Sequence, residues 1–190
     1  YDFYGSQLSL RCLHRSTESG SGLWGEGAHN IISADVDDDG RDEIIFGSAA
    51  LDHDGSLLYR TGMGHGAATH VSDIDLDNPG LEVFMVHEKR PYGYDLRDAR
   101  TGRILLRDTS DHDTGRGLMA DLDAHHRGGE LMSASHHMML SAHGEPIAPW
   151  RAGSVTSSGL NARIYWDGDL LDEYMDRAHI DKWDSEAHTF

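Results

Sequence analysis

Short apolar runs alternate with polar, glycine-containing turns along the whole chain. The clearest runs, Glu43–Phe46, Glu82–Val86 and Glu130–Met132, are rich in Ile, Val, Phe, Leu and Met. Runs this short between turn residues are typical of β-strands, because helices need longer stretches with a 3.6-residue period. The pattern therefore predicts an all-β protein. The best helix candidate is Leu170–Arg177.

The pattern also repeats. A small residue followed by Asp-x-Asp occurs three times, and the first aspartates of the copies, Asp35, Asp73 and Asp121, lie 38 and 48 residues apart. A weaker fourth unit covers 164–169. Repeats of about 40–50 residues that each hold several short strands are typical of β-propeller blades. We expect about four blades' worth of a propeller, in a single module over residues 1–190.

The number of blades indicates whether the chain forms a whole propeller or part of one. Four blades are the fewest that close a propeller, and an open half leaves two exposed sheet edges. The chain starts at Tyr1 rather than at a methionine, and it contains no signal peptide. We therefore expect a piece of a larger propeller, truncated at both ends.

The segment 35–43 carries the strongest chemical signal. Aspartates occupy loop positions 1, 3 and 5, Gly40 permits a sharp turn at position 6, and a carbonyl and a glutamate follow at positions 7 and 9. Such an all-oxygen ligand set suits calcium. The spacing matches the first half of an EF-hand loop, with a strand in place of the second helix. The alternative interpretation is a solvated, Asp-rich turn.

Two further segments resemble this loop. The second, 73–82, keeps the 1-3-5 aspartates and turns through Pro79-Gly80, whereas the third, 121–130, has His125 at position 5. Imidazole is a poor calcium ligand, so the third loop is as consistent with a lost site as with a working one. The predicted Ca²⁺ ligands are Asp35, Asp37, Asp39, Arg41 (by its carbonyl), Glu43, Asp73, Asp75, Asp77, Glu82, Asp121, Asp123 and Glu130.

Charge and composition exclude several functions. The chain has 33 acidic and 16 basic residues and a formal net charge of −17, which argues against binding to nucleic acid or to an anionic membrane surface. No apolar stretch is long enough to span a bilayer. The single cysteine, Cys12, cannot form an intrachain disulfide. The glycine-rich run 62–66 is not a dinucleotide loop, because no βαβ unit surrounds it.

Other polar residues fall at related places in the repeat. His29-Asn30 and Arg116 lie just before the first and third Asp loops, and His65 lies eight residues before Asp73. Equivalent positions on successive blades sit side by side around one rim, so two histidines and an arginine would converge. Convergent polar groups in a concave mouth suggest a binding site. The alternative is that these residues make hydrogen bonds between blades.

The ordered set of segments resembles the rhamnogalacturonan lyases that are built on an eight-bladed propeller. The matching segments are Tyr1–Phe3, His29–Ile45, Leu51–Gly55, Gly64–Ala67, Pro79–Phe84, Val86–Glu88, Gly115–Gly117, Trp166–Leu171 and Ile180–Trp183. These segments cover essentially the whole chain. The resemblance implies a secreted, cell-surface or periplasmic, monomeric enzyme that cleaves rhamnogalacturonan I of pectin by calcium-assisted β-elimination at galacturonate.

By the same resemblance, Arg116, His65 and His29 are expected to be catalytic, and His70, His87 and Asn30 to bind substrate. The family also has a later segment of the type Asn-Gly-Thr-Lys with a catalytic lysine, and residues 1–190 contain no such segment. The chain is therefore expected to be about half of a catalytic module. Two alternatives stay open: a non-catalytic, calcium-stabilised propeller that binds carbohydrate or protein, and a scaffold that has lost activity.

Overall fold

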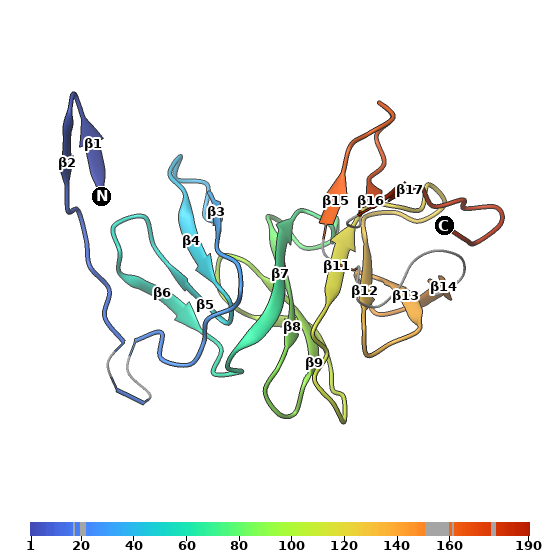
Figure 1. Ribbon diagram of the computed structural model, residues 1–190, viewed down its shortest axis with the longest axis horizontal. Coiled ribbons are helices and arrows are strands. Elements are labelled where there is room, and N and C mark those ends of the chain that lie inside the picture. The colour runs from blue at the N-terminus through green and yellow to red at the C-terminus, as the bar shows by residue number, and fades with distance from the viewer. Residues whose placement is uncertain (17, 20–21, 151–159, 161, 176–177) are drawn as a thin grey trace.

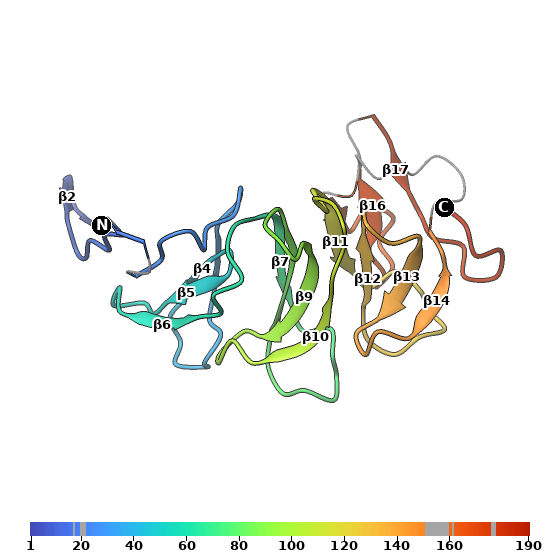
Figure 2. The same cartoon turned by 90° about the horizontal axis from the view of Figure 1, so that it is seen from below.

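The computed structural model describes residues 1–16, 18–19, 22–150, 160, 162–175 and 178–190. Within these residues all helix-or-strand structure is β-strand, so the all-β prediction is confirmed. A hairpin of β1 (Asp2–Tyr4) and β2 (Gln7–Ser9) comes first, and four antiparallel sheets follow in chain order (Figures 1 and 2). No helix in the described ranges is long and apolar enough to cross a membrane.

Each sheet is a meander in which consecutive strands are hydrogen-bonded neighbours. Sheet 1 contains β3 (Ile32–Ala34), β4 (Glu43–Phe46), β5 (Ala49–Leu51) and β6 (Leu57–Arg60). Sheet 2 contains β7 (Gly66–Ser72), β8 (Glu82–His87), β9 (Gly93–Asp98) and β10 (Ile104–Asp108). Sheet 3 contains β11 (Gly117–Ala120), β12 (Glu130–Ser133), β13 (Met138–Ser141) and β14 (Pro146–Pro149). Sheet 4 contains β15 (Ala162–Ile164), β16 (Glu173–Met175) and β17 (Ile180–Asp181).

The sheets bury their faces against one another. Every residue of β8 is buried, because side chains on its two faces enter different cores. Val83 packs with Ile45 and other residues of sheet 1, whereas Phe84 packs with Met119 and other residues of sheet 3. A central strand covered on both faces reads as a continuous apolar run rather than as an alternating one. The sequence run Glu82–Val86 has this character and forms most of β8.

A glycine permits the tight turn between β4 and β5 of sheet 1. Gly47 joins β4 to β5 with φ +65°, and a Cβ at this position would lie 2.3 Å from the carbonyl oxygen of Glu26. Only glycine accommodates both the positive φ and this close backbone approach. The next residue, Ser48, donates its backbone N–H to the same Glu26 oxygen at 2.7 Å, which ties the segment before β3 to the turn.

The helix predicted at Leu170–Arg177 is wrong over its described part. Glu173–Met175 is strand β16, and Asp176 and Arg177 lie outside the described residues. Leu, Glu and Met favour helices in isolation, but Tyr174 is fully buried and pairs with Arg163 on β15 and Asp181 on β17. Tertiary pairing therefore overrides a weak local propensity here.

Candidate functional site

Two histidines and a glutamate meet close to the start of β3, the start of β7 and the end of β8. His29 Nε2 lies 3.0 Å from Glu88 Oε1, His65 Nε2 lies 3.4 Å from Glu88 Oε2, and the two imidazole nitrogens are 3.4 Å apart. The rings stand edge to face, with centroids 5.0 Å apart. We call these residues the rim triad. Two imidazoles and a carboxylate with all ligand atoms within 4.8 Å of one another can hold a divalent cation.

Backbone pairing between the two sheets creates this arrangement. Ala28 and Gly66 form a parallel bridge, and the N–H of Gly66 donates to the carbonyl of Gly27 at 3.2 Å. A Cβ on Gly66 would lie 2.2 Å from the carbonyl oxygen of Val86 on the neighbouring strand β8, so glycine permits the close packing within sheet 2 at the residue where β7 also meets sheet 1. His29 and His65 flank this bridge and are therefore brought side by side.

A depression of about 240 Å³ lies beside the triad. His29, Asn30, Ala67, Ala68, Thr69, His70 and Arg116 line it. Arg116 is exposed, and its Nη1 donates to the carbonyl of Gly115 at 2.9 Å. Within the described part of the chain no carboxylate lies at ion-pair distance from Arg116. Other described arginines, such as Arg107, also form no ion pair, so the place of Arg116 in the depression is what distinguishes it.

His70 occupies the floor of this depression between sheets 2 and 3. Its Nε2 donates to the carbonyl oxygen of Gly117 at 2.9 Å, which fixes the proton on that nitrogen. Burial lowers the pKa of His70 below its usual value, so the ring is neutral at pH 7. His70 therefore faces the depression as an uncharged group.

Asn30 and His87, which were predicted to bind substrate, contact other groups of the protein. Asn30 lines the depression, but both ends of its amide are used: Nδ2 donates to the carbonyl of Thr69 at 2.7 Å, and Oδ1 accepts the Thr69 N–H at 3.2 Å. This is the hydrogen bonding between repeats that the sequence left as an alternative. His87 does not lie on the rim. It is 2% exposed, and its Nε2 lies 2.6 Å from Asp95 Oδ1 inside sheet 2.

A shared backbone motif shapes the four Asp loops, which we define as residues 35–43, 73–82, 121–130 and 165–173. In each, the buried glutamate that starts the following strand accepts the N–H of the loop's second residue on Oε2, at 2.9, 2.9, 2.7 and 2.6 Å in turn. These glutamates are Glu43, Glu82, Glu130 and Glu173. The repeated glutamate thus holds the backbone of each loop in place without any bound ion.

The first Asp loop fits a cation. Asp35, Asp37 and Asp39 each offer one oxygen within 4.8 Å of the others. Buried oxygens Asp37 Oδ1 and Glu43 Oε1 accept no hydrogen bond, although Glu43 is completely buried. Buried, unpartnered carboxylate oxygens are costly without a counter-charge, so this donor set is consistent with the predicted calcium.

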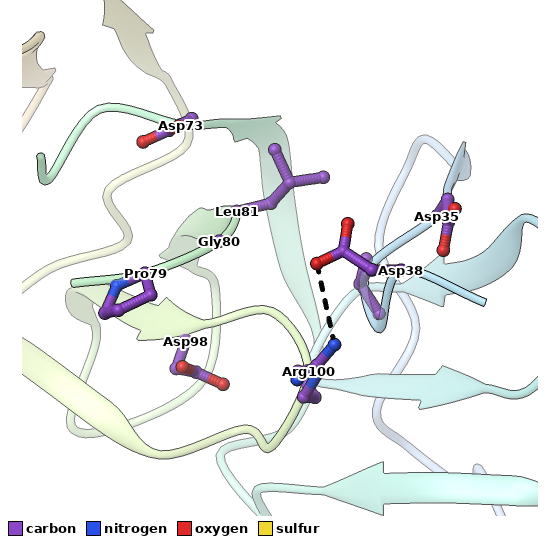
Figure 3. A pocket seen from close by; sticks show the side chains of 9 residues that line it. Asp35, Asp38, Asp73, Pro79, Gly80, Leu81, Asp98 and Arg100 are labelled. Atoms are coloured by element: carbon purple, nitrogen blue, oxygen red, sulfur yellow. Dashed lines mark ion pairs between the residues drawn. The ribbon is translucent and has the colours of Figure 1, made fainter. Parts of the chain in front are cut away.

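His53 was missed by sequence reasoning. Its Nδ1 lies 3.4 Å from Asp39 Oδ2, although it comes from the β5–β6 turn, and its Nε2 accepts from the Arg41 guanidinium at 2.7 Å. The Arg41 side chain thus faces the turn, whereas the prediction concerned only its carbonyl. A cleft of about 280 Å³ separates the first loop from the second, and Arg100 reaches across it toward Asp38 at 3.8 Å (Figure 3).

In the second loop, protein donors already take the carboxylate oxygens. His143 Nε2 contacts Asp75 Oδ1 at 2.9 Å, Arg127 donates to Asp77 at 2.7 Å, and Asn78 donates to Glu82 Oε1 at 2.7 Å. The hydrogen bond to Asp75 raises the pKa of His143. Asp73 is one of the residues that line the cleft of Figure 3, and within the described residues it forms no ligand group with Asp75 and Asp77.

In the third loop, protein groups take several of the carboxylate oxygens, although Glu130 Oε1 accepts no hydrogen bond. Trp183 Nε1 donates to Asp123 Oδ2 at 2.9 Å, and the backbone N–H groups of Leu122 and Asp123 donate to Glu130. Burial raises the pKa of Glu130 to about 8, so this carboxyl is largely protonated at pH 7. Asp121 does not gather with Asp123 and Glu130 as a ligand group in the described residues.

The family model for the C-terminal domain of rhamnogalacturonan lyase family 11 matches residues 1–190. The chain belongs to this family. Among its relatives, the rhamnogalacturonan endolyase YesW of Bacillus subtilis (strain 168) is 47% identical over 187 residues, which cover 97% of the chain and 29% of YesW. The rhamnogalacturonan exolyase YesX of the same organism is 41% identical over 206 residues, covering 98% of the chain and 32% of YesX.

Solved structures agree with this assignment to family 11. The rhamnogalacturonan lyase PL11 of Bacillus licheniformis superposes with a TM-score of 0.87 at 43% identity, over 100% of this chain and 32% of the lyase. The crystal structure of YesW superposes with a TM-score of 0.79 at 46% identity, over 91% of this chain and 29% of YesW. The chain therefore spans about a third of the length of these relatives.

Proposed function

We propose that the protein to which this chain belongs is a polysaccharide lyase that cleaves rhamnogalacturonan I by β-elimination at galacturonate. The observation that carries the proposal is the unpaired Arg116 guanidinium, which shares a depression with the rim triad residue His29. Membership of family 11 and the names of the relatives support the same reaction.

β-Elimination needs a group that neutralises the uronate carboxylate, a base for the C5 proton and a proton donor for the leaving O4. The C5 proton of a uronate becomes removable only when the adjacent carboxylate is neutralised, and the leaving O4 must receive a proton. A guanidinium binds a carboxylate through two parallel N–H donors, and Arg116 is the group placed to do so. His29 and His65 orient the sugar or share proton transfer, with Glu88 holding both rings. The base that removes the C5 proton is expected in the rest of the protein.

Calcium is the proposed cofactor. The first Asp loop would hold it through Asp35, Asp37, Asp39, the Arg41 carbonyl and Glu43, and the unpartnered oxygens of Asp37 and Glu43 support this assignment. When bound there, calcium neutralises the clustered carboxylates and stabilises the start of β4. Calcium in the second and third loops stays a prediction that the protein donors described above do not favour.

The proposal also covers the fold, the binding partners and the localisation of the protein. Successive antiparallel meanders that bury their faces against one another support blades of a β-propeller. The net charge of −17 argues against nucleic acid and anionic membrane surfaces as partners, and the uronate carboxylate would be bound through the local basic group Arg116. A pectin-degrading enzyme of this kind acts outside the cytoplasm, as a secreted or cell-surface monomer.

The full-length protein should be incubated with rhamnogalacturonan I, with calcium or with a chelator, and the unsaturated uronate product followed in the near ultraviolet. We expect a calcium-dependent signal, no signal on homogalacturonan, and a loss of about 100-fold or more in kcat/KM for Arg116→Ala. Arg107→Ala is the matched control, because Arg107 is exposed on β10 and belongs to neither the depression nor an Asp loop. A folded, calcium-loaded protein without activity would instead favour a binding propeller.

A further inference from the structure

The fourth Asp loop contains a cation that belongs to the chain itself. Asp167, Asp169 and Glu173 each place one carboxylate oxygen within 4.8 Å of the other two. The Lys182 ammonium forms ion-paired hydrogen bonds with Asp167 and Asp169, and its Nζ lies 3.5 Å from Glu173 Oε1. One ammonium thus contacts every carboxylate of the cluster.

The framework of this loop matches that of the first Asp loop. In both, the position-5 aspartate accepts the N–H of the residue two places later on Oδ1, at 2.9 Å for Asp39 and 2.8 Å for Asp169. In both, the buried glutamate anchors the second residue. The two loops share these two hydrogen bonds and cluster their carboxylates, and like charges this close repel unless a cation lies between them.

The two loops differ in what reduces the repulsion between their carboxylates. In the described residues, no lysine or arginine forms an ion pair with Asp35, Asp37 or Asp39 of the first loop. Neither Glu43 Oε1 nor Glu173 Oε1 accepts a hydrogen bond, but Lys182 Nζ lies 3.5 Å from the second of these oxygens. The fourth loop has Tyr165 at position 1, so it presents one carboxylate fewer. Three carboxylates and one ammonium leave less negative charge than four carboxylates without a cation.

Strand pairing explains how Lys182 reaches the cluster. In the β16–β17 hairpin, Met175 pairs with Ile180 and Tyr174 pairs with Asp181. The next step of this antiparallel register places Lys182 opposite Glu173. Because the register is fixed by the buried Tyr174, the ammonium is held at the loop by covalent connection and strand geometry, and dilution or a chelator cannot remove it.

We propose that Lys182 is the resident cation of the fourth Asp loop and that this loop keeps sheet 4 folded without a divalent ion. This role is independent of the lyase activity proposed above. It divides the repeated Asp loops into one type that takes an external cation and one type that the chain neutralises itself.

Hydrogen–deuterium exchange of the full-length protein tests this proposal, with calcium and with EDTA. We expect exchange in 162–175 to be the same in both conditions for the wild type. In Lys182→Met, which removes the charge and keeps the length, we expect exchange in this segment to rise at least tenfold in EDTA. Lys182→Arg should retain most of the protection, because the charge is kept.

Lys89→Met is the control, since Lys89 is the only other lysine of the chain and lies outside sheet 4. It should leave exchange in 162–175 unchanged. The proposal is overturned if EDTA alone deprotects 162–175 in the wild type, or if Lys182→Met exchanges like the wild type in EDTA. The wild-type comparison requires no variant to fold, and none of these readouts depends on lyase activity.

Discussion

Replacing Asn30 by alanine should destabilise the β7 edge of sheet 2. β7 is an edge strand of its sheet, and at Thr69 the free edge is paired by the Asn30 amide, which donates to the carbonyl and accepts from the N–H. Thr69 is 2% exposed, so its backbone groups have little access to water. The Asn30 side chain thus replaces a neighbouring strand at this one residue pair.

The magnitude follows from the two hydrogen bonds. Each contributes about 0.5–1.5 kcal/mol, and a buried group left without a partner costs about 1–3 kcal/mol. Because water can partly replace the lost amide at the exposed Asn30 position, we expect Asn30→Ala to cost about 2–3 kcal/mol of local stability. This corresponds to about 30- to 150-fold faster exchange of the Thr69 amide if opening is local.

Amide exchange across β7 measures this effect, with Asn30→Asp as the matched variant. Aspartate can still accept from the Thr69 N–H but cannot donate to the Thr69 carbonyl, so an intermediate change is expected. If Asn30→Ala leaves the Thr69 amide within about threefold of the wild type, the clamp does not stabilise the edge. A rise in KM without any change in exchange would instead assign Asn30 to substrate binding.

Three further predictions concern the interior. In denaturant titrations, Glu130→Gln should be more stable than the wild type by on the order of 2–4 kcal/mol at pH 9 and similar to it at pH 5. The reason is the raised pKa of Glu130: the stability that its protonated form contributes is complete below about pH 4.5 and is lost as the pH rises through about 8. Gly66→Ala should lower Tm markedly and weaken His65-dependent activity, because its Cβ would meet the Val86 carbonyl oxygen at 2.2 Å. Arg97→Ala should cost about 3–5 kcal/mol of unfolding free energy, because it leaves the buried Asp95 carboxylate without its charge partner at 2.8 Å.

Local patterns were sufficient for the strands and for the outline of the Asp loops. The apolar runs that begin at Glu43, Glu82 and Glu130 each start a strand, because a short run between turn residues has few other ways to bury its side chains. The repeat also placed His29 and His65 near the same edge, since residues at equivalent places in a repeated fold lie on neighbouring units. Residue type and spacing carry this information without any long-range contact.

Tertiary structure alone decided which groups meet. Glu88 joins His29 across 59 residues of chain, and His143 reaches Asp75 across 68. Neither contact has a sequence signal, because the packing of one sheet on the next sets the distance. The burial of His87 depends in the same way on neighbouring strands. A carboxylate cluster in the sequence therefore predicts the need for a cation, whereas the fold determines whether an ion or a side chain such as Lys182 supplies it.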